Sequence, residues 1–507
     1  MTFIRIGDRN RETKEILDAG ARAATGLEQA GIGKGDVIAL LLRNDYAFLE
    51  ASLAAGQIGA YATPVNWHNA PAEVRYVLED SGARLLVAHA DLLARVAGEI
   101  PAGVTVLAVP TPADLCAIYG VESPPLPAGV EDWDQWVARH ATRTAEPLPS
   151  PGAMFYTSGT TGRPKGVRRA QPTPDLAAHS LEMFLALTGM RDWMDRPHEA
   201  VALIAGPLYH GTPNGWTQAL VPMGVNLVIE QRFDAEALLE HIQRYRVTHA
   251  LLVPTMFVRM LKLPPEVRAK YDLSSLQFIM HGGAPCPPAV KQAMIDWLGP
   301  IIAEHYGSTE VGVITVADSP QWLSHPGTVG KPLPAVRIEI LDEAGEPLPA
   351  NQSGDIYCKN FGYVDFTYHG DDEKRKRAEK RGLVSLGDVG FLDDDGFLHL
   401  SGRSSEIIVS GGTNIYPAEI EGELLKLAGV ADCAVFGIPN EEFGEEVCAY
   451  VQPQPGATLD PAVIRSSLRE TIAGYKVPRT IAFIEALPRE DSGKVFKKRL
   501  RDPYWAR

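Results

Sequence analysis

The chain of 507 residues has few cysteines and no long apolar run. Its five cysteines (Cys116, Cys286, Cys358, Cys433 and Cys448) lack the short spacings of a zinc site or a disulfide framework. No apolar stretch reaches the roughly 18 residues that span a membrane, and the charged start MTFIRIGDR lacks the apolar core of a signal peptide. We therefore expect reduced cysteines, no integral membrane segment and a cytoplasmic location.

Basic residues are also scarce relative to acidic ones. The 48 Lys and Arg residues against 63 Asp and Glu give a formal net charge of -15, which argues against nucleic acid as a partner because phosphate backbones bind to basic surfaces. The length exceeds what one hydrophobic core usually supports, so two or more domains are expected. A hydrophobic content of 45% is that of an ordinary soluble enzyme.

The pattern of apolar residues predicts an α/β fold. Helical spacing at 13–30, 47–60 and 73–80 alternates with strand-like stretches at 37–42, 60–65 and 84–88. This alternation is typical of parallel-rich sheets with helices on their faces. The Pro-rich stretch 110–151 is expected to be a surface excursion, whereas strand pairs at 336–341 with 354–359 and 389–392 with 397–400 predict an antiparallel subdomain.

Residues 156–167 (YTSGTTGRPKGV) are the most informative stretch, and a short apolar strand is expected just before them. Glycines let backbone amides approach an anion, hydroxyls donate to phosphate oxygens, and a lysine adds positive charge. The residues of these kinds are Thr157, Ser158, Gly159, Thr160, Thr161, Gly162, Lys165 and Gly166. Their composition predicts a loop that wraps a polyphosphate.

Two other interpretations of this stretch are disfavoured. A P-loop of the Walker type has a Ser or Thr directly after its lysine, but Gly166 follows Lys165 here. A Ser/Thr/Gly linker between domains rarely follows a buried strand or holds one lysine between Pro164 and a glycine.

The stretch resembles the signature loop of the adenylate-forming superfamily, which includes acyl-CoA synthetases, amino-acid adenylation domains and firefly-type luciferases. Further motifs extend the resemblance over most of residues 150–500. Two apolar strands, 276–280 and 301–303, each run into a glycine-containing turn, which predicts adjacent βα loops at one edge of a sheet. The resemblance implies that Gly283, Ala284 and Pro285 lie along the adenine and that Tyr306, in the motif His305-Tyr306-Gly307, packs on the adenine face. It also implies that Thr309 contacts the α-phosphate. Asp388 would bind the ribose hydroxyls, and Arg403 would bind ribose or phosphate.

Glu310 is the magnesium ligand that the resemblance implies. A carboxylate beside a polyphosphate is strongly unfavourable unless a cation lies between them, which supports this role. The alternative is that Glu310 caps the N-terminus of a following helix.

The C-terminal part supplies the remaining family motifs. By resemblance, Lys494 is the catalytic lysine of the first step, and Gly411 and Gly412 belong to a glycine loop that faces CoA. The same resemblance places a domain boundary after Arg403, with an N-terminal AMP- and acyl-binding domain at 1–403 and a small mobile α/β domain at 404–507. Many relatives carry Asp or Lys at the pivot, where this chain has Ser405.

The acid pocket is expected around the strand end at 200–205. Relatives place an aromatic-His pair there, so His210 is carried over as a catalytic and pocket residue. A buried ammonium would need an acidic partner, and residues 212–216 offer none, which favours a plain carboxylic acid over an amino acid. The other candidate pocket residues are apolar or aromatic for the most part and predict a fatty, cyclic, steroid-type or aromatic acid: Trp216, Thr255, Met256 and Val313.

The predicted activity is ligation of a carboxylic acid to CoA through an acyl-adenylate, with ATP, Mg²⁺ and CoA as cofactors. The first step joins two anions, so the site must gather positive charge and position both reactants. Two alternatives remain, an adenylating oxidase of luciferase type and a non-catalytic acyl-adenylate sensor. A homodimer is left open.

Overall fold

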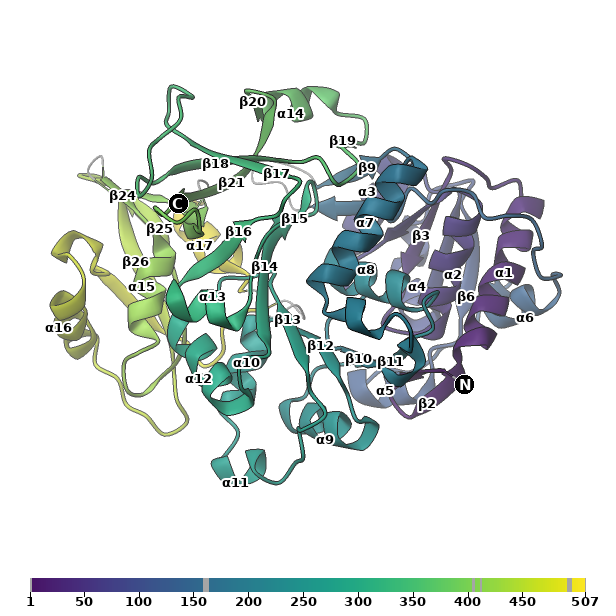
Figure 1. The fold of residues 1–507 in the computed structure, drawn as a ribbon, viewed down its shortest axis with the longest axis horizontal. Coiled ribbons are helices and arrows are strands. Elements are labelled where there is room, and N and C mark those ends of the chain that lie inside the picture. The colour runs from purple at the N-terminus through teal and green to yellow at the C-terminus, as the bar shows by residue number, and fades with distance from the viewer. Residues whose placement is uncertain (1, 158–163, 404–405, 411–412, 490–494, 507) are drawn as a thin grey trace.

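The computed structural model describes residues 2–157, 164–403, 406–410, 413–489 and 495–506 (Figure 1). It confirms the predicted α/β class: parallel-rich sheets, an antiparallel region and a smaller C-terminal sheet follow one another along the chain. No helix in the described ranges is long and apolar enough to cross a membrane.

The first sheet is parallel throughout, as the alternating pattern predicts. Its strands are β4 (Tyr61–Pro64), β3 (Val37–Leu41), β5 (Leu85–His89), β6 (Thr105–Val109) and β7 (Glu131–Asp132), in that spatial order. The helices α1 (Thr13–Gln29), α2 (Tyr46–Gln57), α3 (Pro71–Ser81) and α4 (Ala90–Val96) connect or cover these strands. The Asp45 carboxylate accepts the Tyr46 N–H and so begins α2.

The long central sheet carries the candidate site. Its parallel part contains β1 (Phe3–Ile6), β11 (Asn226–Ile229), β10 (Val201–Ile204), β12 (His249–Leu252), β13 (Phe278–His281) and β14 (Ile302–Ser308), and β2 (Arg9–Glu12) pairs antiparallel with β1. Alternate residues of a strand face opposite sides. Ala202 and Ile204 accordingly join one hydrophobic cluster with α2 and α8 (Gly211–Leu220), while Val201 and Leu203 join another with α9 (Ala235–Tyr245), α10 (Pro254–Leu261) and α12 (Pro288–Leu298).

Beyond β14 the same sheet becomes antiparallel. Its strands are β15 (Gly312–Ala317), β16 (Thr328–Pro332), β22 (Leu398–Arg403), β21 (Leu383–Leu392), β18 (Gly354–Asn360) and β17 (Val336–Leu341), with β20 (Glu379–Lys380) pairing with β21. The pairs β17–β18 and β21–β22 confirm both predicted hairpins.

A three-stranded antiparallel sheet joins segments that are far apart in sequence. In it β9 (Lys165–Arg169) lies between β8 (Phe155–Thr157) and β19 (Phe366–Tyr368), and α14 (Asp372–Arg377) follows β19. The last sheet contains β24 (Thr413–Ile415), β23 (Ile408–Ser410), β26 (Gly444–Pro453), β25 (Val430–Asn440) and β27 (Thr480–Phe483). With α15 (Pro417–Leu424), α16 (Pro461–Thr471) and α17 (Lys497–Trp505), it forms the green-to-yellow part at the left of Figure 1.

Two predictions about local structure are wrong. The stretch 110–151 is not only a surface excursion, because α6 (Trp133–Ala138) buries Trp133 completely and its indole N–H donates to Glu50 of α2 at 2.8 Å. The turn after β14 is not a βα loop either: β14 continues to Ser308 and pairs with β15 as an antiparallel hairpin. Glu310 therefore lies in a β-turn, and no helix follows for it to cap.

Candidate active site

The base of the predicted phosphate loop is held by Asp80 of α3. Thr157, the last residue of β8, pairs with Lys165, the first of β9; Ser158, Gly159, Thr160 and Thr161 lie outside the described residues. Lys165 Nζ lies 3.0 Å from Asp80 Oδ1, and the Tyr156 hydroxyl donates to Asp80 Oδ2 at 2.9 Å. The hydrogen bond with Asp80 raises the pKa of Lys165, so its positive charge is secure at neutral pH.

The predicted adenine loop connects β13 to α12, in agreement with its prediction as a βα loop. Gly282 lies so close to His305 that an added Cβ would sit 2.4 Å from the imidazole Cε1, and Gly283 has a φ of +77°. A side chain at Gly282 would thus separate β13 from β14 at the point where both strands reach the site. Gly283, Ala284 and Pro285 follow at the surface, where each is exposed or half-buried.

Beneath this loop lies a charged pair that the sequence did not predict. Lys291 of α12 is fully buried, and its Nζ lies 2.6 Å from Oε2 of Glu304 on β14. His281 Nε2 lies 3.7 Å from the same oxygen, and burial followed by the Lys291 charge lowers the pKa of His281. The ion pair links α12 to β14, the strand that also carries Tyr306.

Tyr306, Asp388 and Arg403 come together in one cluster. The Tyr306 hydroxyl donates to Asp388 Oδ2 at 2.6 Å, and Arg403 Nε lies 3.1 Å from Oδ1. Burial and the neighbouring Asp388 carboxylate raise the pKa of Tyr306, which keeps this phenol protonated as a donor. Each carboxylate oxygen can accept more than one hydrogen bond, which is the property that recognition of a vicinal diol requires.

Thr309 and Glu310 occupy the turn between β14 and β15, where Gly307 allows a close approach to the Gly312 carbonyl. Arg169 Nη2 donates to the carbonyl oxygens of both Thr309 and Glu310, the second at 3.0 Å. The Tyr368 hydroxyl donates to Glu310 Oε1 at 3.2 Å. Neither Arg169 nor Tyr368 belongs to a motif that points to this role from the sequence alone.

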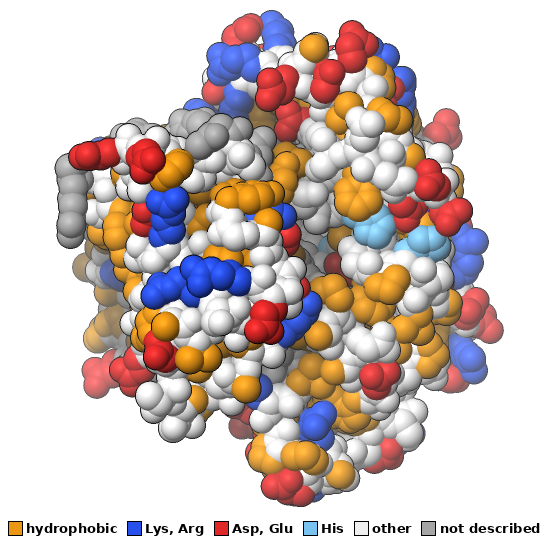
Figure 2. All heavy atoms as spheres, turned by 90° about the vertical axis from the view of Figure 1, so that its left-hand side faces the viewer, with side chains coloured by type: hydrophobic (Ala, Val, Ile, Leu, Met, Phe, Trp, Pro, Cys, Tyr) orange, Lys and Arg blue, Asp and Glu red, His pale blue; other side chains and the backbone are white. Residues whose placement is uncertain are grey.

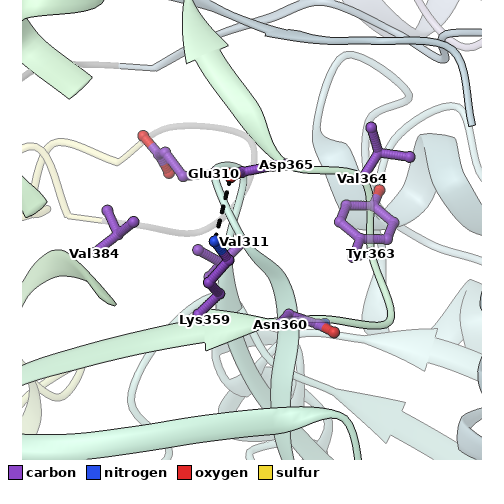
Figure 3. A pocket seen from close by; sticks show the side chains of 8 residues that line it. All are labelled: Glu310, Val311, Lys359, Asn360, Tyr363, Val364, Asp365 and Val384. Carbon is purple, nitrogen blue, oxygen red and sulfur yellow. Dashed lines mark ion pairs between the residues drawn. The ribbon is translucent and has the colours of Figure 1, made fainter. Parts of the chain in front are cut away.

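A small pocket adjoins Glu310 (Figure 3). In that view Glu310 lies on one side and Tyr363 on the other, with the Lys359–Asp365 ion pair (3.7 Å) between. The described residues contain no group of three His, Cys, Asp or Glu side chains that could hold a metal by themselves. A half-buried single carboxylate nevertheless fits Mg²⁺, which usually binds to one or two carboxylates together with phosphate oxygens and water.

The predicted acid-pocket residues do not form one contact cluster. His210 precedes α8, and its ring centroid lies 4.4 Å from that of Tyr209. Trp216 of α8 packs on one face of the central sheet against Phe184 of α7 (Pro174–Leu187), whereas Met256 of α10 packs on the other face. Thr255 and Val313 are half-buried, so the grouping of these residues as a pocket stays a prediction.

In the C-terminal part, Gly411, Gly412 and Lys494 lie outside the described residues, as do residues 404–405 with the expected pivot at Ser405. Arg489 and Val495, which flank the segment containing Lys494, form an isolated β-bridge. Arg489 Nε donates to Asp432 Oδ2 at 3.0 Å. Next to Asp432, the Ala431 carbonyl accepts from Lys262 Nζ at 2.8 Å. The strand β25, which Arg489 contacts through Asp432, therefore also contacts the residue that follows α10.

Comparison with known proteins decides the family. The family model for AMP-binding enzymes matches residues 7–364, and the model for the AMP-binding enzyme C-terminal domain matches residues 419–494. The chain belongs to the AMP-binding enzyme family. It is 33% identical to a feruloyl-CoA synthase of Amycolatopsis sp over 99% of this chain and 95% of the relative. A 2-succinylbenzoate–CoA ligase of Geobacillus kaustophilus is 32% identical over 98% and 93%, respectively.

Solved structures of the same family match the fold. ATP-bound MatB from Rhodopseudomonas palustris superimposes with a TM-score of 0.82 at 27% identity, covering 99% of this chain and 96% of that one. The family assignment confirms the predicted enzyme class, an ATP-dependent, AMP-forming acid–thiol ligase with ATP, Mg²⁺ and CoA as cofactors.

Proposed function

We propose that this AMP-binding enzyme activates an apolar carboxylic acid in two half-reactions. The acid first attacks the α-phosphorus of ATP, giving an acyl-adenylate and pyrophosphate. The CoA thiol then attacks the acyl carbon, and AMP leaves. The observation that carries the proposal is the cluster of Tyr306, Asp388 and Arg403, because three predicted nucleotide contacts from distant segments meet within hydrogen-bond distance.

The proposed roles follow from charge and position. Asp388 accepts from the ribose, with Tyr306 and Arg403 holding its carboxylate. Lys165, Thr157 and the rest of the loop between them bind the phosphates. When bound, Mg²⁺ on Glu310 would neutralise phosphate charge, which lowers the repulsion between the two reacting anions.

Lys494 is proposed to supply the cation of the first step, and the segment 404–507 is proposed as a separate domain that pivots near Ser405 between half-reactions. His210 is proposed to lie at the junction of the acid pocket and the CoA channel. The glycines Gly411 and Gly412 are proposed to face CoA in the second step.

The acid is proposed to be aromatic, cyclic or fatty. Support comes from the apolar character of Trp216 and Met256 and from relatives named for feruloyl and 2-succinylbenzoate substrates. The described residues 212–216 contain no acidic side chain for a substrate ammonium. A cytoplasmic location and a homodimer stay predictions, which fractionation and sedimentation would test.

The decisive experiment measures ATP–pyrophosphate exchange with a graded panel of aromatic, cyclic and fatty acids, followed by CoA-dependent release of AMP. Exchange with at least one apolar acid is expected. An oxygen electrode separates a luciferase-type oxidase from a ligase, and a sensor would bind acyl-adenylate without any exchange. Absence of exchange with every acid would refute the proposal.

Lys494→Ala provides the residue-level test. We expect it to lower the adenylation rate by about a hundredfold or more, because a charge that stabilises the transition state is lost. Thioester formation from supplied acyl-adenylate should continue. The matched control is Lys498→Ala, which removes an exposed lysine from α17 and should leave both half-reactions within about twofold. Equal loss of both half-reactions in Lys494→Ala would contradict its assignment.

A further inference from the structure

The three-stranded sheet β19-β9-β8 connects the phosphate loop to the proposed magnesium ligand. Lys165 begins β9 directly after the loop, and Arg169 ends the same strand. Residues two apart in a strand share a face, so Lys165, Val167 and Arg169 point to one side. Tyr368 of β19 pairs directly with Val167, which puts the tyrosine on this side too.

Arg169 and Tyr368, which share this face, both contact the turn that contains Glu310. The Arg169 guanidinium donates to the carbonyl oxygens of Thr309 and Glu310 and lies over the Tyr363 ring, 4.9 Å from its centroid. The Tyr368 side chain is buried, with 7% of its surface exposed, and its hydroxyl donates to the Glu310 carboxylate. One contact fixes the peptide of the turn and the other fixes the carboxylate itself.

We propose that Tyr368 and Arg169 are positioning residues that hold Glu310 for Mg²⁺. The inference rests on the proposed function, since it requires a metal ion at Glu310. A hydrogen bond to one carboxylate oxygen fixes the rotation of the group, so that the other oxygen is oriented for a cation. Because β9 carries both Lys165 and Arg169, one strand positions the lysine and the guanidinium that contacts the turn with Glu310.

Tyr368→Phe isolates the hydroxyl, because the ring and its packing remain. The measured quantity is the Kd for ATP by calorimetry without acid, once in EDTA and once at saturating Mg²⁺. The ratio of the two Kd values is the gain in affinity that the metal provides. We expect Tyr368→Phe to lower this gain about tenfold, the scale of losing a residue that orients a metal ligand, and to leave the Kd in EDTA unchanged.

The matched control is Tyr357→Phe. Tyr357 of β18 is equally buried, with 6% of its surface exposed, and packs in a separate cluster with Leu341 and Leu383. Tyr357→Phe should keep the wild-type gain in ATP affinity that Mg²⁺ provides. Arg169→Lys should lower the gain, because an ammonium cannot reproduce the planar stacking and the two carbonyl contacts of a guanidinium.

The outcomes separate the two levels of inference. If Mg²⁺ improves ATP affinity in Tyr368→Phe as much as in wild type, the positioning role is overturned while the ligase activity stands. The same holds if Tyr357→Phe lowers this improvement as much as Tyr368→Phe does. Wild-type protein that neither binds ATP nor exchanges pyrophosphate overturns the proposed function and this inference with it. Unfolding temperatures of all variants close to that of wild type establish that binding rather than folding is compared.

Discussion

Lys291→Met tests whether the buried pair beneath the adenine loop stabilises the fold as an ion pair. The Lys291 side chain has no exposed surface, Glu304 has 7%, and their charged atoms are 2.6 Å apart. Methionine nearly conserves the volume but leaves the carboxylate without its cation. Breaking such a pair costs about 3–5 kcal/mol of unfolding free energy, because an uncompensated charge remains in a low-dielectric interior.

The loss of unfolding free energy in Lys291→Met should grow as pH rises. Burial raises the pKa of Glu304, and Lys291 opposes that rise, so the variant should raise the pKa further. Below the unfolded pKa of about 4.3 both states are protonated, and the penalty is small. As pH rises above that value, the unfolded state ionises first in both proteins. Relative to wild type, the variant then loses stability as pH rises from the folded pKa of wild-type Glu304 to the higher folded pKa in the variant.

Urea unfolding at about pH 5 and about pH 8 measures both effects. Fluorescence gives a local probe, because the Trp322 ring centroid lies 5.2 Å from Lys291 Nζ. The double variant Lys291→Met/Glu304→Leu should regain all but about 1–2 kcal/mol, since a matched apolar pair often replaces a buried ion pair at little cost. The exposed Lys270→Met is the control and should stay within about 0.5 kcal/mol. A single variant that loses less than about 1 kcal/mol at the higher pH, or a double variant as unstable as the single one, would refute this account.

Two further substitutions test the nucleotide site. Asp388→Asn removes the charge that Arg403 and Tyr306 contact, and we expect the KM for ATP to rise about tenfold while kcat falls less; a change confined to the KM for CoA would contradict the ribose role. Asp80→Asn removes the charged partner of Lys165 and should raise the KM for ATP about threefold, because the lysine loses its fixed position. Unchanged ATP kinetics in this variant would show that the lysine is positioned by other contacts.

The parallel sheets were predictable because their signal is local. Alternation of helical and strand patterns predicted β3, β4 and β5 with α1 to α3, and each was found within a few residues of its expected place. The stretch 110–151 failed because its proline content suggested a loop. Trp133 is buried there and donates to Glu50 of α2, while Trp136 lies against Gly26 of α1; these contacts depend on the tertiary fold and leave no periodic signal.

The hairpin after β14 shows a different kind of error. The glycine-containing motif suggested a βα turn, although residues 312–317 (GVITVA) carry the β-branched pattern of a strand. The strand pattern of these residues is the local signal that distinguishes this turn from the βα turn after β13. The hairpin excludes the alternative of a helix cap for Glu310, which lies in a β-turn.

For the candidate site, the sequence identified residues expected to touch ligand but missed those that hold them. Ligand contacts lie in short motifs at strand ends, where glycine, hydroxyl and charged residues are conspicuous. Their partners are isolated tyrosines, arginines and acids far along the chain: 85 positions separate Asp80 from Lys165, 58 separate Glu310 from Tyr368, and 141 separate Arg169 from Glu310.

The separation between residues that contact ligand and residues that hold them has a physical cause that bears on catalysis. A site for two anions must keep its cations and its metal carboxylate apart until substrate is bound, because oppositely charged groups left free would pair with one another. In this chain Lys165 is held by Asp80, and Glu310 is held by the neutral hydroxyl of Tyr368, so the two groups are fixed through different partners. Both partners act through β9 and its neighbours, and the strand therefore sets the separation of the charges as well as their orientation.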